Sequence, residues 1–182
     1  MLLALAGVTG IGKSYYKDKI VEKLCFEKIK IITTRKMREG EKNNEDKVFV
    51  NNEELQVMRD NDEIAYEFEM LGNIYAYSKK ELFSNKNTVV ELHYETIFDL
   101  KKICPHLCVI YLLPIDIEMA KNKTRERHLA PNVEEARLKE IDEHYTRINA
   151  DENLRNMFDY VVYNDYDEKS EAEVIELVKK LI

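Results

Sequence analysis

The chain has 182 residues, of which 45% are hydrophobic, and its 35 acidic side chains outnumber its 28 lysines and arginines, so the net charge is −7. This composition predicts a single domain with a sizeable core and argues against a nucleic-acid-binding surface. Apolar runs fall short of the roughly 18 residues of a membrane span, the first residues form a strand pattern rather than a basic leader, and three cysteines suit a reducing compartment, so we expect a cytoplasmic protein without a signal peptide.

The first segment carries a phosphate-binding motif. Residues 2–6 are all apolar and precede a turn and a helical pattern, which predicts a buried parallel strand. The next eight residues match the pattern G-x-x-x-x-G-K-[ST]: Gly7, Val8, Thr9, Gly10, Ile11, Gly12, Lys13 and Ser14. Glycines let backbone N–H groups turn toward a phosphate, and the following helix adds the positive end of its dipole. We therefore expect ATP here, with Lys13 on the β- and γ-phosphates and Ser14 on Mg²⁺.

Strands and helices alternate along the rest of the chain. Helical spacing of apolar residues predicts helices at 13–24, 52–59, 78–83, 93–104, 115–127, 132–148 and 170–182. Apolar runs predict strands at 28–32, 48–50, 88–92, 107–113 and 160–162, with a hairpin at 63–77. Ser78 is expected to cap its helix, and Asn132 with Glu135 to form a capping box. The alternation predicts an α/β fold, a doubly wound parallel sheet with helices on both faces.

Further motifs follow in a fixed order. Residues 33–41 read Thr-Thr-Arg-x-x-Arg-x-Gly-Glu, residues 46–50 read Asp-Lys-Val-Phe-Val, residues 72–76 read Gly-Asn-Ile-Tyr-Ala, and residues 158–165 end in Asn-Asp. With these segments the chain resembles the guanylate kinase family over nearly its whole length. The resemblance implies a P-loop NTPase with a core (about 1–32, 87–119 and 146–182), an inserted mixed β/α NMP-binding region (about 33–86) and a helical lid (about 120–145).

The resemblance also implies an activity. It predicts transfer of the γ-phosphate of ATP, with Mg²⁺, to GMP, dGMP or another nucleoside monophosphate. Small nucleotides are the expected partners, with no nucleic acid and no membrane, and the expected state is a monomer or homodimer. Two alternatives remain at this point: a kinase for a phosphorylated sugar such as ribose 1,5-bisphosphate, and a non-catalytic binding module. The intact Gly12, Lys13 and Ser14 argue against the module.

Several site residues follow from the same resemblance. Arg35 and Arg38 are expected to clamp the acceptor phosphate, with Tyr75 adding a hydroxyl, because two arginine forks three residues apart suit a phosphate dianion. A solvated basic turn is the alternative. Glu91 ends an apolar strand and is expected near Mg²⁺ and the acceptor, although a simple strand-end charge is an even alternative. The predicted ATP site also includes Tyr15 and Asn164.

The lid is expected to supply cations to the transferring phosphate. Lys123 and Arg127 keep the Arg-x-x-x-Arg spacing of the family, with the first arginine replaced by lysine. Arg137 and Arg147 both qualify as the further lid arginine. Such cations stabilise charge on the equatorial oxygens of the phosphate. Alternatively, Lys123 and Arg127 only complement a helix dipole.

The base-reading positions of the family are changed. The family reads guanine with a Glu, a Ser or Thr and an Asp, and binds phosphate with a further Ser and Tyr. The residues at these positions are Tyr66, Tyr77 and His93, and Ile31 and Lys47. Guanine donors left unpaired would cost about 1–3 kcal/mol each. Three alternatives follow: Glu67 or Glu69 reads GMP, the acceptor is another base that stacks on the aromatic residues, or these aromatic residues only pack.

Overall fold

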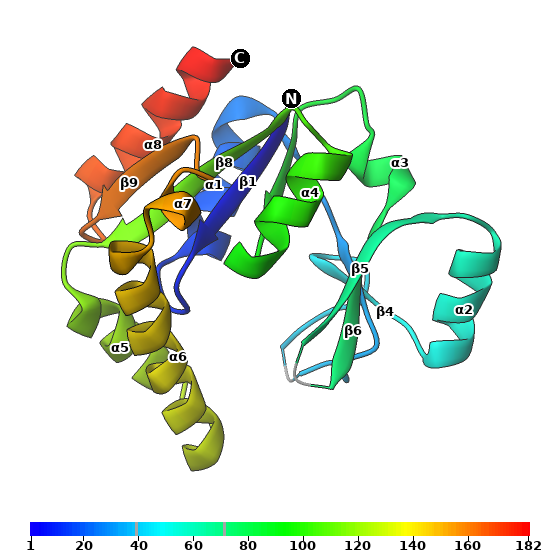
Figure 1. The fold of residues 1–182 in the computed structure, drawn as a ribbon, viewed down its shortest axis with the longest axis horizontal. Coiled ribbons are helices and arrows are strands. Elements are labelled where there is room, and N and C mark those ends of the chain that lie inside the picture. The colour runs from blue at the N-terminus through cyan, green and yellow to red at the C-terminus, as the bar shows by residue number, and fades with distance from the viewer. Residues whose placement is uncertain (39, 71) are drawn as a thin grey trace.

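The computed structural model describes residues 1–38, 40–70 and 72–182 (Figure 1). Glu39 of the arginine motif and Leu71 of the expected hairpin lie outside the described residues. The central sheet is parallel, in the order β2-β7-β1-β8-β9. Its strands are β1 (Leu2–Gly7), β2 (Glu27–Lys28), β7 (Thr88–Glu91), β8 (Leu107–Pro114) and β9 (Tyr160–Asn164). The predicted α/β class is confirmed.

Helices cover both faces of this sheet, because its strands are apolar on both sides. On β1, Leu3 and Leu5 pack toward one face and Ala4 and Ala6 toward the other. The first face is covered by α1 (Lys13–Leu24), α5 (Ile117–Arg125) and α8 (Glu168–Leu181). The second is covered by η1 (Tyr94–Thr96), α4 (Ile97–Ile103), α7 (Glu152–Arg155) and the end of α6 (Pro131–Ala150).

Residues 33–86 build most of a second, four-stranded sheet beside the core (Figure 1). Its order is β4 (Lys47–Phe49), β3 (Ile31–Thr33), β6 (Asn73–Ser78) and β5 (Ile64–Met70), with β3 and β4 parallel and the other pairs antiparallel. Helix α2 (Asn52–Asp60) covers one face, where Leu55 packs against Ile32 and Ala76. Helix α3 (Lys79–Leu82) leads back toward the core.

The caps of two helices follow the polar residues before them. Asn51 and Glu54 form a reciprocal capping box at the start of α2, and Ser78 accepts a hydrogen bond from the backbone N–H of Glu81 at the start of α3. The predicted capping box of Asn132 and Glu135 is wrong. Helix α6 starts one residue earlier at Pro131, whose fixed φ suits the first helical position, so Asn132 already lies inside the first turn.

Two predicted elements are divided differently. The strand predicted at 28–32 is two short strands, β2 in the central sheet and β3 in the second sheet, because the chain crosses between the sheets there. The helix predicted at 93–104 starts as the 3₁₀ turn η1 before α4, and α7 was not predicted.

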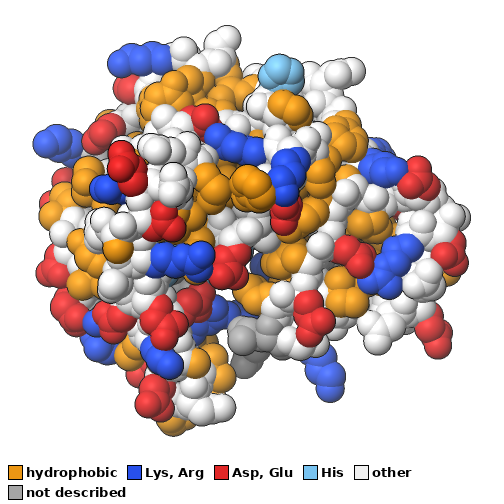
Figure 2. Space-filling view, viewed as in Figure 1, with side chains coloured by type: hydrophobic (Ala, Val, Ile, Leu, Met, Phe, Trp, Pro, Cys, Tyr) orange, Lys and Arg blue, Asp and Glu red, His pale blue; other side chains and the backbone are white. Residues whose placement is uncertain are grey.

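On the face in Figure 2, acidic and basic side chains are interspersed. Within the described residues, no helix combines the length and apolar character needed to cross a membrane.

Candidate active site

The phosphate-binding loop joins the end of β1 to the start of α1. Gly10 has φ of +84°, and a Cβ there would lie 2.4 Å from the backbone oxygen of Ala120, so only glycine fits. Lys13 folds back onto the loop, where its Nζ donates hydrogen bonds to the carbonyls of Gly7 at 2.8 Å and Val8 at 2.9 Å. Burial lowers the pKa of Lys13 to about 8. The ammonium therefore lies where a phosphate would replace carbonyl oxygens as its partner.

Asn164, at the end of β9, holds this loop in place through a hydrogen bond to its backbone. Its Nδ2 donates a hydrogen bond to the carbonyl of Ile11 at 2.8 Å, and its Oδ1 accepts from the Tyr16 hydroxyl at 2.6 Å. The Tyr166 hydroxyl adds a bond to the carbonyl of Gly10 at 3.2 Å. Asn164 was predicted as an ATP contact. The structure gives it a supporting contact with the loop as well as a place in the wall of the cavity described next.

A cavity of about 620 Å³ lies over the loop on the side of α5 and the start of α8. The predicted ATP residues that line it are Thr9, Gly10, Gly12, Lys13, Ser14, Tyr15 and Asn164, together with Lys123 and Arg127. Two predicted ATP residues do not line it. Ile11 is fully buried in the core, and Gly7 lines the neighbouring cavity. The hydroxyl of Tyr15 is hydrogen-bonded to Glu171.

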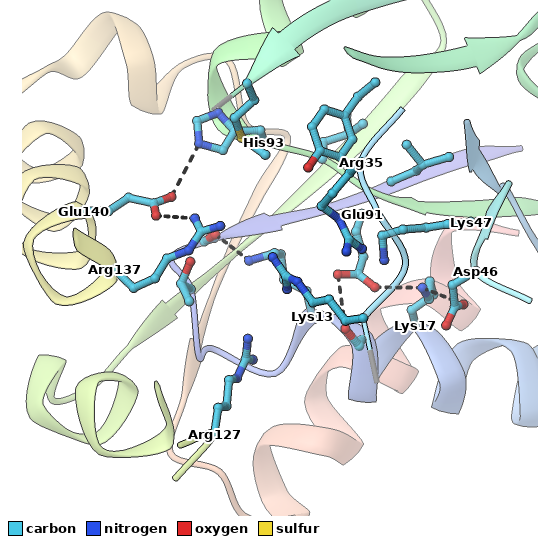
Figure 3. A pocket seen from close by; sticks show the side chains of 18 of the residues that line it. Lys13, Lys17, Arg35, Asp46, Lys47, Glu91, His93, Arg127, Arg137 and Glu140 are labelled. Atoms are coloured by element: carbon cyan, nitrogen blue, oxygen red, sulfur yellow. Dashed lines mark hydrogen bonds and ion pairs between the residues drawn. The ribbon is translucent and has the colours of Figure 1, made fainter. Parts of the chain in front are cut away.

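A second cavity, of about 540 Å³, lies between the central sheet, the second sheet and residues 127–144 (Figure 3). The predicted acceptor residues that line it are Arg35, Arg38, Lys47, Tyr75, Tyr77, Glu91 and His93. Tyr66 does not line it. It lies farther along β5, where its ring stacks on Phe68 and Tyr77, while Phe68 and Met70 of the same strand face reach the cavity. Tyr66 therefore supports the wall rather than forming it.

The two cavities meet at the phosphate-binding loop. Both are lined by Thr9, Lys13, Ser14, Glu91 and Arg127. This shared wall contains two cations, two hydroxyls and one carboxylate. A phosphorylated molecule in each cavity would therefore place its phosphate against the same small group of side chains, which suits transfer between the two.

Glu91 is the centre of a partly buried charge network that includes Lys17, a residue the sequence motifs did not indicate. Its Oε1 forms an ion pair with Lys17 at 2.7 Å, and its Oε2 accepts a hydrogen bond from the Ser14 hydroxyl at 3.2 Å. Lys17 is 5% exposed and also pairs at 3.0 Å with Asp46, which lies directly before β4 of the second sheet (Figure 3). Lys28 pairs with Asp46 at 3.2 Å. The sequence indicates Lys17 through its position, because it lies one helical turn after Lys13 and therefore shares the same face of the helix.

These contacts keep Glu91 ionised beside the Ser14 hydroxyl. Burial would raise the pKa of Glu91, but the Lys17 and Lys13 ammonium groups hold it below its usual range. The side-chain oxygens of Ser14 and Glu91 lie together at the carboxyl end of β7, and Mg²⁺ prefers oxygen ligands. Within the described residues, no cluster of three His, Cys, Asp or Glu side chains could hold a metal ion. A bound Mg²⁺ would therefore take its remaining ligands from phosphates and water.

Arg35 is held by a carboxylate in the cavity wall. Its guanidinium donates two hydrogen bonds to Glu41, at 2.7 and 2.9 Å, and lies 5.3 Å from the centre of the Phe49 ring. Glu41 also accepts from the backbone N–H of Arg38 and pairs with Lys47 at 3.7 Å. The side chain of Arg35 is only 10% exposed, which contradicts a solvated basic turn at this residue. Both bonds to Glu41 come from Nη2, while Nη1 donates to the carbonyl of Lys36, so Glu41 occupies an anion position beside the guanidinium that suits a phosphate.

The lid cations differ in position. Arg127 lines both cavities, and Arg137 lines the second, where it pairs with Glu140 of α6 at 2.5 Å. Lys123 lines the first cavity and pairs with Glu126. Arg147 pairs with Glu95 at 3.6 Å and lines neither cavity. Between the two arginines that the sequence left open, the structure therefore brings Arg137 to the site.

The two glutamates considered as guanine readers face away from the site. Residues 66, 68 and 70 share one face of β5, so Glu67 and Glu69 lie on the other. Glu67 pairs with Arg59 of α2 at 2.9 Å. Both glutamates are exposed and neither lines the cavity.

Comparison with known proteins agrees with the motifs. The family model described as guanylate kinase matches residues 1–181. The chain is 29% identical over 171 residues to a guanylate kinase of Bacillus cereus, covering 91% of this chain and 80% of that protein. It is 27% identical over 187 residues to that of Anaplasma phagocytophilum, covering 98% and 86%.

Solved structures share the fold. The guanylate kinase from Anaplasma phagocytophilum has a TM-score of 0.75 at 23% identity and covers 100% of this chain and 85% of that one. A shikimate kinase from Bacteroides thetaiotaomicron has a TM-score of 0.51 at 10% identity, covering 100% and 97%. The resemblance inferred from the motifs is confirmed by the family match over the whole chain. The chain belongs to the guanylate kinase family.

Proposed function

We propose that the chain is an ATP-dependent nucleoside monophosphate kinase that transfers the γ-phosphate of ATP to GMP or dGMP, or to another nucleoside monophosphate. The observation that carries this proposal is the junction of two cavities at Lys13, Ser14, Glu91 and Arg127. The relatives named guanylate kinase support GMP as the first acceptor to test. The comparisons favour this acceptor class over the phosphorylated sugar and the non-catalytic module.

The loop residues have the chemistry to hold the donor. Lys13 exchanges the carbonyls of Gly7 and Val8 for the β- and γ-phosphate oxygens, and backbone N–H groups of the loop supply further donors. Ser14 and Glu91 are the residues that would hold Mg²⁺. When bound, Mg²⁺ supplies positive charge that neutralises the phosphates. The first cavity takes the nucleoside of ATP between the loop, α8 and the lid.

The second cavity has the chemistry to hold the acceptor. Arg35 exchanges Glu41 for the acceptor phosphate, and Arg38, Lys47 and Tyr75 line the same wall. Arg127 and Arg137 bring charge to the equatorial oxygens of the transferring phosphate, where it spreads in a loose transition state. A general base is unnecessary because the attacking phosphate oxygen is already anionic.

A coupled assay of ADP formation tests the proposal. The protein is incubated with MgATP and, one at a time, with GMP, dGMP, AMP, CMP, UMP, dTMP and ribose 1,5-bisphosphate. We expect turnover with at least one nucleoside monophosphate and its loss in Lys13→Met, with the fold of the variant checked by circular dichroism. Turnover with none of them contradicts the proposal. The cytoplasm, and a monomer or homodimer, remain our expectations for where and how the kinase works.

A further inference from the structure

The acceptor cavity has a wall that offers few hydrogen bonds to a base. On the side of the two sheets, the apolar lining includes Ile29, Ile31, Phe68, Met70, Tyr77 and Leu92. The Tyr77 hydroxyl is buried and directed toward the carbonyl of Glu91 at 3.5 Å. A nucleoside whose phosphate lies at Arg35 can pack against this wall. Its polar edge must then find partners elsewhere in the cavity.

Two polar side chains face each other across the cavity from that wall. His93 follows β7 in the core, and Glu140 lies on α6 in the lid. The Nε2 of His93 lies 3.7 Å from Oε1 of Glu140, while Oε2 of Glu140 pairs with Arg137 (Figure 3). Among the described residues, Oε1 of Glu140 has no hydrogen bond within normal distance. This oxygen is therefore placed to accept one from a ligand.

Glu140 differs from the other carboxylates of the cavity. Glu91 and Asp46 are held by Lys17 at the phosphate end. Burial would raise the pKa of Glu140, but His93 and Arg137 lower it to about 2, so the carboxylate is ionised at neutral pH. Glu67 lies on the opposite face of β5 and does not line the cavity. Among the described lining residues, Glu140 is therefore the carboxylate that the edge of a base can reach without breaking the ion pairs of Lys17.

We propose that Glu140, positioned by His93, is the residue that reads the acceptor base, and that the base is guanine. Guanine presents its N1–H and N2–H₂ donors side by side, and one carboxylate can accept both. Adenine instead presents the N1 lone pair to the carboxylate, which is repulsive. The inference rests on the proposed kinase function and assigns its base selectivity to the lid. Because the same carboxylate holds Arg137, reading the base also positions a lid arginine.

The test compares two acceptors that differ by one amino group. The ratio of kcat/KM for GMP to kcat/KM for IMP, which lacks the N2 amino group, is measured with saturating MgATP. We expect the wild type to prefer GMP by about tenfold or more. In Glu140→Gln, kcat/KM for GMP should fall roughly 10- to 100-fold and the ratio should approach one. Glu143→Gln, an exposed change one turn farther along α6, is the matched control and should alter neither value.

The alternatives give different results. If Glu140 acts only by holding Arg137, GMP and IMP lose activity in the same proportion and the inference is overturned. A wild type that uses another nucleoside monophosphate but not GMP also overturns it, while the proposed function stands. If the wild-type protein phosphorylates none of the acceptors tested, the proposed function itself is contradicted. If Glu140→Gln does not fold, His93→Asn carries the test, with KM for GMP expected to rise more than kcat falls; a fall in kcat alone overturns the inference.

Discussion

Replacing Lys17 with methionine tests whether the charge network around its buried ammonium holds the central sheet and the second sheet together. The side chain of Lys17 is 6% exposed and pairs with Glu91, which is 23% exposed, and with Asp46, which is 41% exposed. Removing one partner of a fully buried ion pair costs about 3–5 kcal/mol. Ser14 still contacts Glu91 and Lys28 still contacts Asp46. We therefore expect a loss of roughly 2 kcal/mol in the free energy of unfolding, below that range because both carboxylates keep a partner.

Thermal unfolding followed by circular dichroism measures this loss. For a chain of this size, 2 kcal/mol corresponds to a fall in Tm of roughly 4–8 °C. Lys19→Met is the matched control on α1, because Lys19 pairs with the exposed Glu22 and lies 5.8 Å from the centre of the Tyr15 ring, so its loss should cost less than about 1 kcal/mol. If Lys17→Met and Lys19→Met unfold within about 1 °C of each other, the network does not stabilise the fold and the reasoning is refuted.

The pH dependence gives a second measure of the same network. In the wild type, the pKa of Glu91 lies below the ordinary value of 4.5, so its ion pair contributes stability above that pH and loses the contribution as pH falls through the lowered pKa. The variant lacks this contribution at every pH. The difference in unfolding free energy between the two proteins should therefore shrink as pH falls below about 4.5.

Three further predictions address the loop and the acceptor wall. Lys13→Met should reduce turnover by about a hundredfold or more. Lys13 releases its proton near pH 8 in the folded protein and near pH 10.5 in the unfolded chain, so the unfolding free energy of the wild type should rise relative to that of the variant between these pH values. A constant difference in unfolding free energy over this range would contradict the lowered pKa. Gly10→Ala should cost about 1–3 kcal/mol in urea unfolding, because its Cβ would lie 2.4 Å from the Ala120 oxygen; no change would show that the loop adjusts freely. Arg35→Gln should raise the acceptor KM by about tenfold or more and leave the KM for MgATP unchanged; an equal rise in both would argue against a role confined to the acceptor.

The parts of the fold that depend on neighbouring residues could be predicted from the sequence. The phosphate-binding loop is one, because the glycines, Lys13 and Ser14 act within a single turn. The strand-helix alternation is another, since each element shows its own apolar pattern. The division of residues 28–32 between two sheets could not be predicted, because both halves are equally suited to a strand and only their distant partners differ.

The parts of the site that depend on distant contacts were less accessible. Lys17 and Glu140 are ordinary charged residues on helices, and their positions at the cavity are fixed with partners 74 and 47 residues away in the chain, at Glu91 and His93. Tyr66 shares the cavity-facing side of β5 but lies too far along the strand to line the cavity. Motif spacing places a residue on a face, whereas reaching the cavity depends on how the sheets meet.

The hydrogen bond between Asn164 and the loop carbonyl of Ile11 has a consequence for how the chain folds while it is being synthesised. The loop is made within the first 14 residues, yet it is fastened by a side chain 153 positions later. Its strand β1 also lies between β7 and β8, which emerge from the ribosome long after it. A nascent chain stalled before Asn164 should therefore hold its loop loosely, and its affinity for a nucleotide should rise once β9 has been translated and has emerged.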